Sequence, residues 1–281
     1  MAANIKELFR LYRLYGRMDL NWFLQDSVVC VIVILSELIA NIAGFSGVLL
    51  LALRFGGVGG LSADEVLFML GFFQLADGFT SMMFGGFNVL VISRRVGRGQ
   101  LDHMLIQPRP LILQMLGEGF MPVSGSSGFW MGLIVTIVAG MRLHLAVSPL
   151  WILAFILYLL CHAGIKVGEG FLTGAGAFYK PVALEEVSAQ VIHLTGLLGR
   201  YPLAGLPGWA LGVLYTVFPA GLMAYLPALI LLGKIGKGAY LALPVAVAAA
   251  FLAAATYFFK KGMRHYAQFS CNRYRDIGHR N

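Results

Sequence analysis

Several apolar runs, each close to 20 residues or longer, constrain this chain more than any other feature, because about 20 apolar helical residues cross a bilayer core. Only 12% of the 281 residues are charged, about half of the roughly 25% that soluble domains carry. These features predict an all-α polytopic membrane protein with six transmembrane helices. The six runs are Ser27–Leu53, Glu65–Ile92, Leu111–Met141, Val147–Thr173, Val182–Leu198 and Ala239–Phe259.

The distribution of basic residues predicts the topology. With six spans and a cytoplasmic amino end, 16 of the 21 lysines and arginines lie on the cytoplasmic side, as the positive-inside rule predicts. The exceptions are Arg54, Arg142, Arg200, Lys234 and Lys237. The net charge of +8 is therefore attributed to membrane topology, and no nucleic-acid partner is expected. Both termini are predicted to be cytoplasmic.

Three regions follow from this pattern. Residues 1–25 are predicted to form an amphipathic helix along the cytoplasmic membrane surface, residues 26–260 the transmembrane domain, and residues 261–281 a basic cytoplasmic tail. In the first region the apolar side chains recur at helical spacing and are expected to reach the acyl boundary, opposite Lys6, Arg10, Arg13 and Arg17. They are Ile5, Leu8, Phe9, Tyr12, Tyr15 and Met18.

The loop 93–110 interrupts the apolar sequence with a compact basic stretch. We interpret it as a short helix that binds a soluble partner. Gly97 and Gly99 allow a sharp turn out of the preceding span, and Leu101, Leu105 and Ile106 form an apolar anchor. Arg98 and Asp102, four residues apart, are predicted to pair. Pro108 and Pro110 end the helix.

Prolines also break the apolar segment 200–237, since proline removes a backbone donor and disfavours helix in the preceding residue. We expect broken re-entrant helices on the outer side, rather than two additional full spans, packed against protein or lining a cavity. The residues that mark the segment as a candidate external gate are Tyr201, Pro202, Pro207, Trp209, Pro219, Tyr225 and Pro227.

Polar side chains inside the spans are costly and often functional. Glu37, Asn41, Gln74 and Asp77 lie at similar depth and either form one midplane cluster facing a pathway or make structural hydrogen bonds between helices. Lys166 and Glu169 are spaced to pair on one helix face. Together with Glu185 and Glu186 they predict a structural ion network.

Two chemistries are disfavoured. The Glu185-Glu186 pair resembles part of an intramembrane metalloprotease signature, but Gln190 replaces the required arginine and His162 and His193 lack matched depth, so no metal site is expected. The nearest imitation of a phosphate-binding loop, the 233–238 stretch, lacks the spacing and the hydroxyl. This chain is not expected to hold ATP by that route, nor any other cofactor.

Three stretches resemble the permease subunits of type-2 ATP-binding-cassette exporters, in their small six-span bacterial subfamily. They are the Arg-Gly-x-Leu-Asp…Pro order at 98–108, the proline-aromatic block at 201–227, and the basic tail with Tyr266 and Tyr274-Arg275. The resemblance covers nearly the whole chain. The residues it marks for coupling to an ATPase are Arg98, Gly99, Leu101, Asp102, His103, Leu105 and Pro108.

The resemblance implies a protein of the bacterial inner membrane that is not itself an enzyme. A separate cytoplasmic ATPase subunit would bind ATP and Mg²⁺, and a second permease subunit, identical or paralogous, would complete the pathway. A secondary transporter is the alternative, although the sequence lacks an internal repeat with interrupted spans in both halves. The intramembrane metalloprotease is a weaker alternative.

Overall fold

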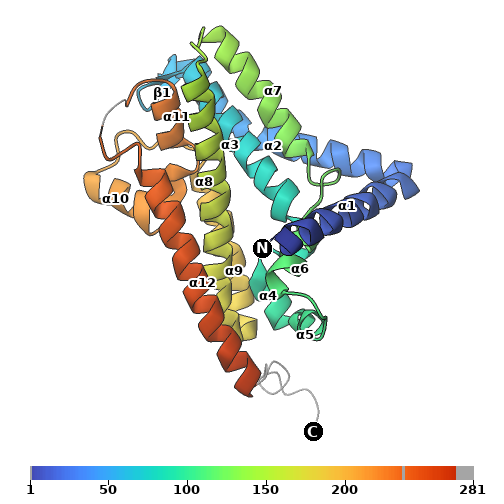
Figure 1. The fold of residues 1–281 in the computed structure, drawn as a ribbon. Helices are drawn as coiled ribbons and strands as arrows, with labels where there is room; N and C mark the ends of the chain where they lie inside the picture. The colour runs from blue at the N-terminus through green and yellow to red at the C-terminus, as the bar shows by residue number, and fades with distance from the viewer. Residues whose placement is uncertain (1, 236–237, 270–281) are drawn as a thin grey trace.

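The computed structural model describes residues 2–235 and 238–269, and it is helical almost throughout (Figure 1). Four helices are long and apolar enough to cross a membrane, and a fifth span results if a bent pair counts as one. The four are α2 (Ser27–Phe55), α3 (Ala63–Phe84), α8 (Pro149–Gly174) and α12 (Leu243–Phe269). The all-α polytopic class is therefore confirmed.

Two of the six predicted runs do not form such helices. The third is split into α6 (Leu111–Glu118) and the shorter α7 (Ser127–Arg142), because Gly119, Pro122 and Gly125 lie in a non-helical link of eight residues. The fifth forms α9 (Pro181–Leu198), in which Glu185, Glu186 and other polar residues keep the hydropathy below that of a candidate span. The second run also ends early, at Phe84, before Gly85 and Gly86.

The core is centred on α3, whose Phe68, Phe72 and Phe73 are almost fully buried. α3 packs closely against α7, and α8 runs beside α12 (Figure 1). Glycines permit the α3–α7 approach. A Cβ atom at Gly78 or Gly132 would overlap the backbone of the opposite helix. The outer surfaces of α2, α8 and α12 remain apolar and exposed, as lipid-facing surfaces are.

The amino-terminal helix α1 (Ala2–Gln25) is confirmed as a helix, and two of its tyrosines pack against other parts of the protein. Tyr12 stacks on Phe120, with ring centroids 4.7 Å apart, and Tyr15 meets Phe87 edge-on. Phe9 and Met18 are exposed, at 68% and 52%. The reason is the link between α6 and α7, which offers α1 a protein surface. The side chain of Ile5 lies outside the described residues.

The proline-rich segment is broken as predicted. α10 (Gly208–Thr216) is followed by the 3-10 turn η3 (Pro219–Leu222) and by α11 (Tyr225–Leu231), with a bend of 72° between the two halves. It packs near the short hairpin of β1 (Gly57–Val58) and β2 (Leu61–Ser62), where the Lys234 ammonium donates to the Gly60 carbonyl at 2.9 Å.

At the carboxyl end, α12 continues without a break across the predicted domain boundary at residue 260. Residues 270–281 of the predicted basic tail, including Tyr274 and Arg275, lie outside the described residues.

Candidate functional site: the junction between α3 and α6

Two short helices, not one, occupy the loop 93–110. After the 3-10 turn η1 (Gly86–Asn88), α4 (Ile92–Gly97) and α5 (Gln100–Leu105) meet at Gly99, whose φ of +67° lies in the left-handed region. Glycine adopts this conformation without the steric cost that a side chain brings. A glycine turn is therefore present, but it lies between α4 and α5 and not at the exit from the span, and Gly97 is part of α4.

The two faces of α5 differ sharply in burial. Leu101 is fully buried and Met104 is 4% exposed, within a cluster that also contains Ile92, Val96 and Phe178. Leu105 is 44% exposed and Ile106, just past the helix, is 82% exposed. The predicted apolar anchor is thus divided, because Leu101 holds α5 to its own chain while the other two side chains face outward.

The predicted pair between Arg98 and Asp102 is wrong. The Arg98 guanidinium lies 3.2 Å from a Glu185 carboxylate oxygen of α9, and Asp102 accepts a hydrogen bond of 2.5 Å from the Tyr266 hydroxyl of α12. The helix breaks at Gly99, so Arg98 and Asp102 do not share a helix, and each finds a partner far away in sequence. His103 and Pro108 are exposed.

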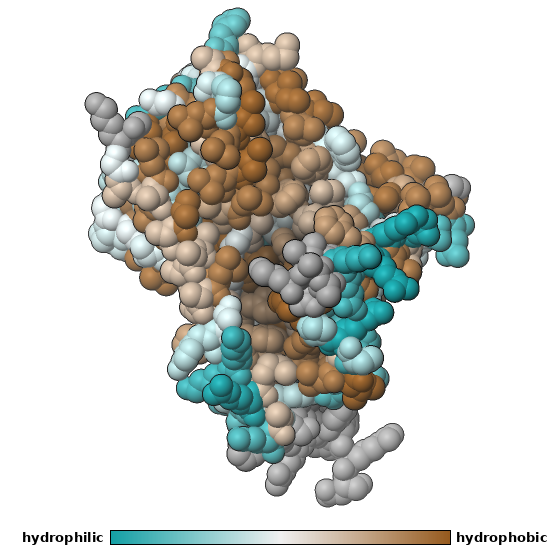
Figure 2. Space-filling model, in the orientation of Figure 1, coloured by the Kyte–Doolittle hydropathy of each residue, from teal (hydrophilic) through white to brown (hydrophobic). Residues whose placement is uncertain are grey.

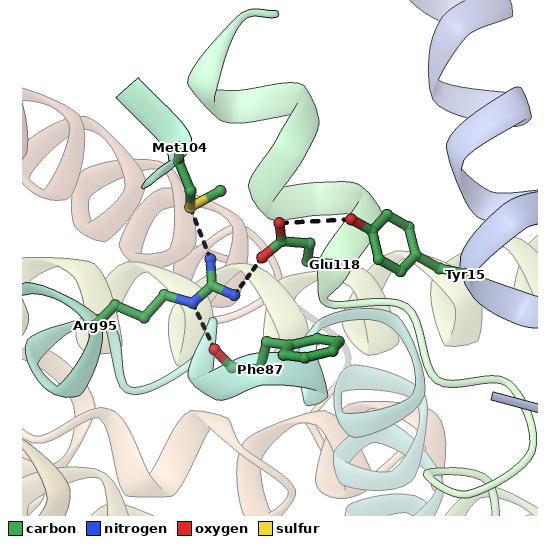
Figure 3. A network of polar contacts seen from close by, with 5 residues as sticks. All are labelled: Tyr15, Phe87, Arg95, Met104 and Glu118. Carbon is green, nitrogen blue, oxygen red and sulfur yellow. Dashed lines mark hydrogen bonds and ion pairs between the residues drawn. The ribbon is translucent and has the colours of Figure 1, made fainter. Parts of the chain in front are cut away.

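Arg95 is the residue that sequence reasoning missed. It is 3% exposed, and its guanidinium has three partners from separate segments (Figure 3). Nε donates to the Phe87 carbonyl at 2.5 Å, one terminal nitrogen lies 2.9 Å from the Met104 sulfur, and the other lies 2.5 Å from a Glu118 carboxylate oxygen. Arg95 therefore connects η1, α5 and α6.

The same network reaches α1 through a tyrosine. The Tyr15 hydroxyl donates to the second carboxylate oxygen of Glu118 at 3.5 Å (Figure 3). Burial, and then the negative charge of Glu118, raise the pKa of the Tyr15 phenol, so it stays neutral and remains a donor. The sequence gives only a weak indication that Arg95 is buried. Arg95 lies three residues after Ile92 and one before Val96, so it shares the buried side of α4 with these apolar residues.

Two of the four pathway candidates, Glu37 and Asp77, have partners on different helices. Glu37 accepts a hydrogen bond from the Ser127 hydroxyl of α7, whereas Asp77 pairs with Lys166 of α8. No hydrogen bond or ion pair joins Glu37 to Asp77 in the part of the chain that the structure describes. Gln74 is buried beside Gly128, and Asn41 is half-buried. These contacts support the structural alternative, hydrogen bonding between helices, and the pathway role of the four residues stays a prediction.

The predicted Lys166–Glu169 pair is also wrong. Lys166 turns to Asp77, and the buried Glu169 accepts a hydrogen bond of 2.5 Å from the Thr195 hydroxyl of α9. Nδ1 of the fully buried His162 lies 2.9 Å from the Met223 carbonyl oxygen. Across residues 2–235 and 238–269, no group of three histidine, cysteine, aspartate or glutamate side chains is placed to hold a metal ion.

The external gate candidates divide into two sets. Pro219, Tyr225 and Pro227 are buried, while Trp209 and Tyr201 are 76% and 50% exposed. Pro207 precedes α10, and Pro202 lies against Gly59 of the hairpin loop. The break at Phe218-Pro219 is therefore part of the packed core, and the exposed Tyr201 and Trp209 both precede it in the chain.

The fold and this junction define a multi-pass membrane protein in which two short helices, α4 and α5, lie between α3 and α6. The family described as "ABC-2 family transporter protein" matches residues 37–270. The chain belongs to this family, as a membrane permease of the ATP-binding-cassette class. No curated protein and no solved structure matches it.

Proposed function

We propose that this chain is the permease subunit of an ATP-driven exporter and that α5 binds a separate cytoplasmic ATPase subunit. ATP and Mg²⁺ would be held by that subunit, and a second permease, identical or paralogous, would complete the pathway. The observation that carries the proposal is the pair of exposed apolar side chains, Leu105 and Ile106, on an element whose opposite face is locked into the protein.

Contiguous exposed apolar patches rimmed by polar residues mark interaction sites. A small hydrophobic patch is visible in Figure 2 at the place of α5, below the hydrophilic stripe that follows α1. Leu105 and Ile106 are flanked by His103 and Arg109, both exposed. At an interface a few anchor residues carry most of the free energy of binding, and the contacts around them exclude water.

The same geometry supplies a route for mechanical coupling. Leu101 packs with Ile92 and Phe178, Asp102 is bound by Tyr266 of α12, and Met104 contacts Arg95. A displacement of α5 by the ATPase would therefore act on α4, α12 and α6 together. Nucleotide binding would then bias the membrane helices between two arrangements through its differential contacts with each.

The proposed location is the bacterial inner membrane with both termini cytoplasmic. It is supported by the basic residues at one end of the molecule, on α1, on α4 and at the end of α12, because such residues accumulate on the cytoplasmic side. Figure 2 shows the hydrophilic surfaces of α1 and of the lower end of α12 below a mostly hydrophobic upper body.

The test is co-purification with the ATPase subunit and measurement of ATP-dependent transport for Ile106→Asp. We expect at least about a tenfold loss of bound ATPase, because a hot-spot residue contributes more than the free energy of one factor of ten. Gln107→Asp adds the same charge one position away and is the matched control, which should retain the ATPase. Full binding and transport by Ile106→Asp would refute the assignment. Transport driven by a proton or sodium gradient without the ATPase would favour the secondary transporter.

A further inference from the structure

Three arginines of α1 form a stripe that the proposed function does not use. Arg10, Arg13 and Arg17 follow each other at intervals of three and four residues, so they lie on one face of the helix. All three are exposed. With Arg109, from the loop after α5, they line one hollow of about 420 Å³, together with Glu7, Leu11 and Leu14.

The charge in this hollow is unbalanced. Glu7 is its only carboxylate, and it already lies 3.3 Å from the Arg109 guanidinium. Within the described ranges, no ion pair involves Arg10, Arg13 or Arg17. Four guanidinium groups therefore face one carboxylate. A guanidinium presents a planar fork of donors that matches phosphate oxygens, so the hollow favours a phosphate group over a small monovalent anion.

The surroundings of the hollow indicate where that phosphate comes from. Phe9 and Leu14, 68% and 52% exposed, flank the arginine stripe on its two sides. Only Asp26 separates α1 from α2, which is apolar enough to cross the membrane and is almost entirely unburied. α1 therefore lies where headgroups meet acyl chains, the depth at which basic amphipathic helices bind anionic lipid.

We propose that Arg10, Arg13, Arg17 and Arg109 form a binding site for the phosphate of an anionic phospholipid. Arg109 lies four residues beyond the end of α5. A lipid bound by all four arginines joins α1 to the loop that carries the exposed Ile106. The site thus connects the lipid composition of the membrane to the position of the element proposed to bind the ATPase.

The experiment uses the full chain, purified without any ATPase, and measures phosphatidylglycerol retained in native mass spectrometry against phosphatidylcholine. We expect Arg13→Gln/Arg17→Gln to lower phosphatidylglycerol affinity by about tenfold or more, because each basic residue near a membrane surface adds to the attraction. Lys261→Gln/Arg264→Gln removes the same charge from exposed positions on α12 and should leave the affinity within about twofold.

Arg109→Gln tests whether the lipid is bound by both α1 and the loop after α5, or by the arginines of α1 alone. We expect this variant to show an intermediate loss of phosphatidylglycerol affinity. Thermal unfolding of each variant checks the fold. Arg13 and Arg17 are exposed and make no ion pair among the described residues, so their loss should not perturb it, and only a small shift is expected for Arg109→Gln, whose pair with Glu7 is exposed. If both double variants lose the same amount of phosphatidylglycerol affinity, the lipid is held by general electrostatic attraction to the basic surface and not by a defined site, and the proposal is overturned. Competition by millimolar inorganic phosphate would overturn the lipid assignment, leaving a free-phosphate site.

A third result would also overturn it: Arg13→Gln/Arg17→Gln binds phosphatidylglycerol normally but no longer co-purifies with the ATPase, which would make the stripe a protein contact. Lipid retention is measured without the ATPase and without transport. A negative result would therefore overturn the lipid site and leave the proposed exporter function unaffected. Failure of the exporter function would likewise leave the lipid site unaffected.

Discussion

The α3–α7 pair in the membrane and the α4–α5 junction below it are held together by different forces. Between α3 and α7 the backbones touch at Gly78 and Gly132, and the surrounding side chains are large buried apolar groups. The junction has a smaller apolar cluster around Leu101 and, in addition, directional polar contacts to other helices. They include the ion pair of Arg95 with Glu118, the bond between Tyr266 and Asp102, and the pairing of Arg98 with Glu185.

This difference indicates which region can move. Close packing is a sum of many small contacts that no single alternative arrangement reproduces, so α3 and α7 should move as one body. A directional polar bond is made or lost as a unit, and each junction bond joins a different helix. The junction can therefore be rearranged stepwise without opening the core. The following predictions test that contrast, beginning with the largest effect.

Arg95→Met should have the largest effect on stability. It removes one member of a mostly buried ion pair and leaves the Glu118 carboxylate, 17% exposed, without its guanidinium. Breaking such a pair costs about 3–5 kcal/mol. We expect a large fall in the midpoint of thermal unfolding in detergent, with monodispersity followed in parallel.

The double variant Arg95→Met/Glu118→Gln is the control that separates stability from coupling. Removing both charges restores much of the stability, because no unpaired buried charge remains. If the network also transmits motion from α5 to α6, ATP-dependent transport stays low in this double variant. Wild-type transport at restored stability would show that the ion pair only supports the fold.

The second prediction concerns the packed pair. Gly132→Ala places a Cβ atom against the backbone of Leu75 and should cost about 1–3 kcal/mol through overpacking. Gly47→Ala is the matched control on α2, where a Cβ would meet nothing within 4 Å. That change should stabilise the helix by about 0.5–1 kcal/mol. Opposite shifts of the unfolding midpoint are expected, and equal shifts would contradict close α3–α7 packing.

Local signals in the sequence predicted much of the architecture. Long apolar runs gave the spans now seen as α2, α3, α8 and α12, and Phe218-Pro219 gave the bend of 72° between α10 and α11. The turn at Gly99 was likewise predictable, since a glycine needs no partner to adopt a positive φ. The break inside the third run also had a local signal in Gly119, Pro122 and Gly125. The surrounding residues are so apolar that the run was nevertheless predicted as one continuous span.

Polar pairing was not predictable, because it depends on which helices meet. Spacing along one helix suggested Arg98 with Asp102 and Lys166 with Glu169, yet these side chains pair across helices. Arg95 could not be distinguished from Arg94 by residue type, and only the fold buries one of them. In a tightly packed membrane protein an ionisable side chain finds a partner on a neighbouring helix, so helical spacing alone is a weak guide.

The smallest effect is expected for Arg98→Gln. Arg98 is 50% exposed and its partner Glu185 is also within 4.0 Å of Arg94, so Glu185 keeps a cation after the change. An exposed ion pair contributes about 0.2–1 kcal/mol and is screened by salt. The unfolding midpoint should fall slightly at low ionic strength and should not change at high ionic strength. Glu186→Gln is the control, because it leaves both arginine pairs of Glu185 intact. A loss of bound ATPase at unchanged stability would instead place Arg98 in the docking surface beside Ile106, extending that surface from α5 onto α4.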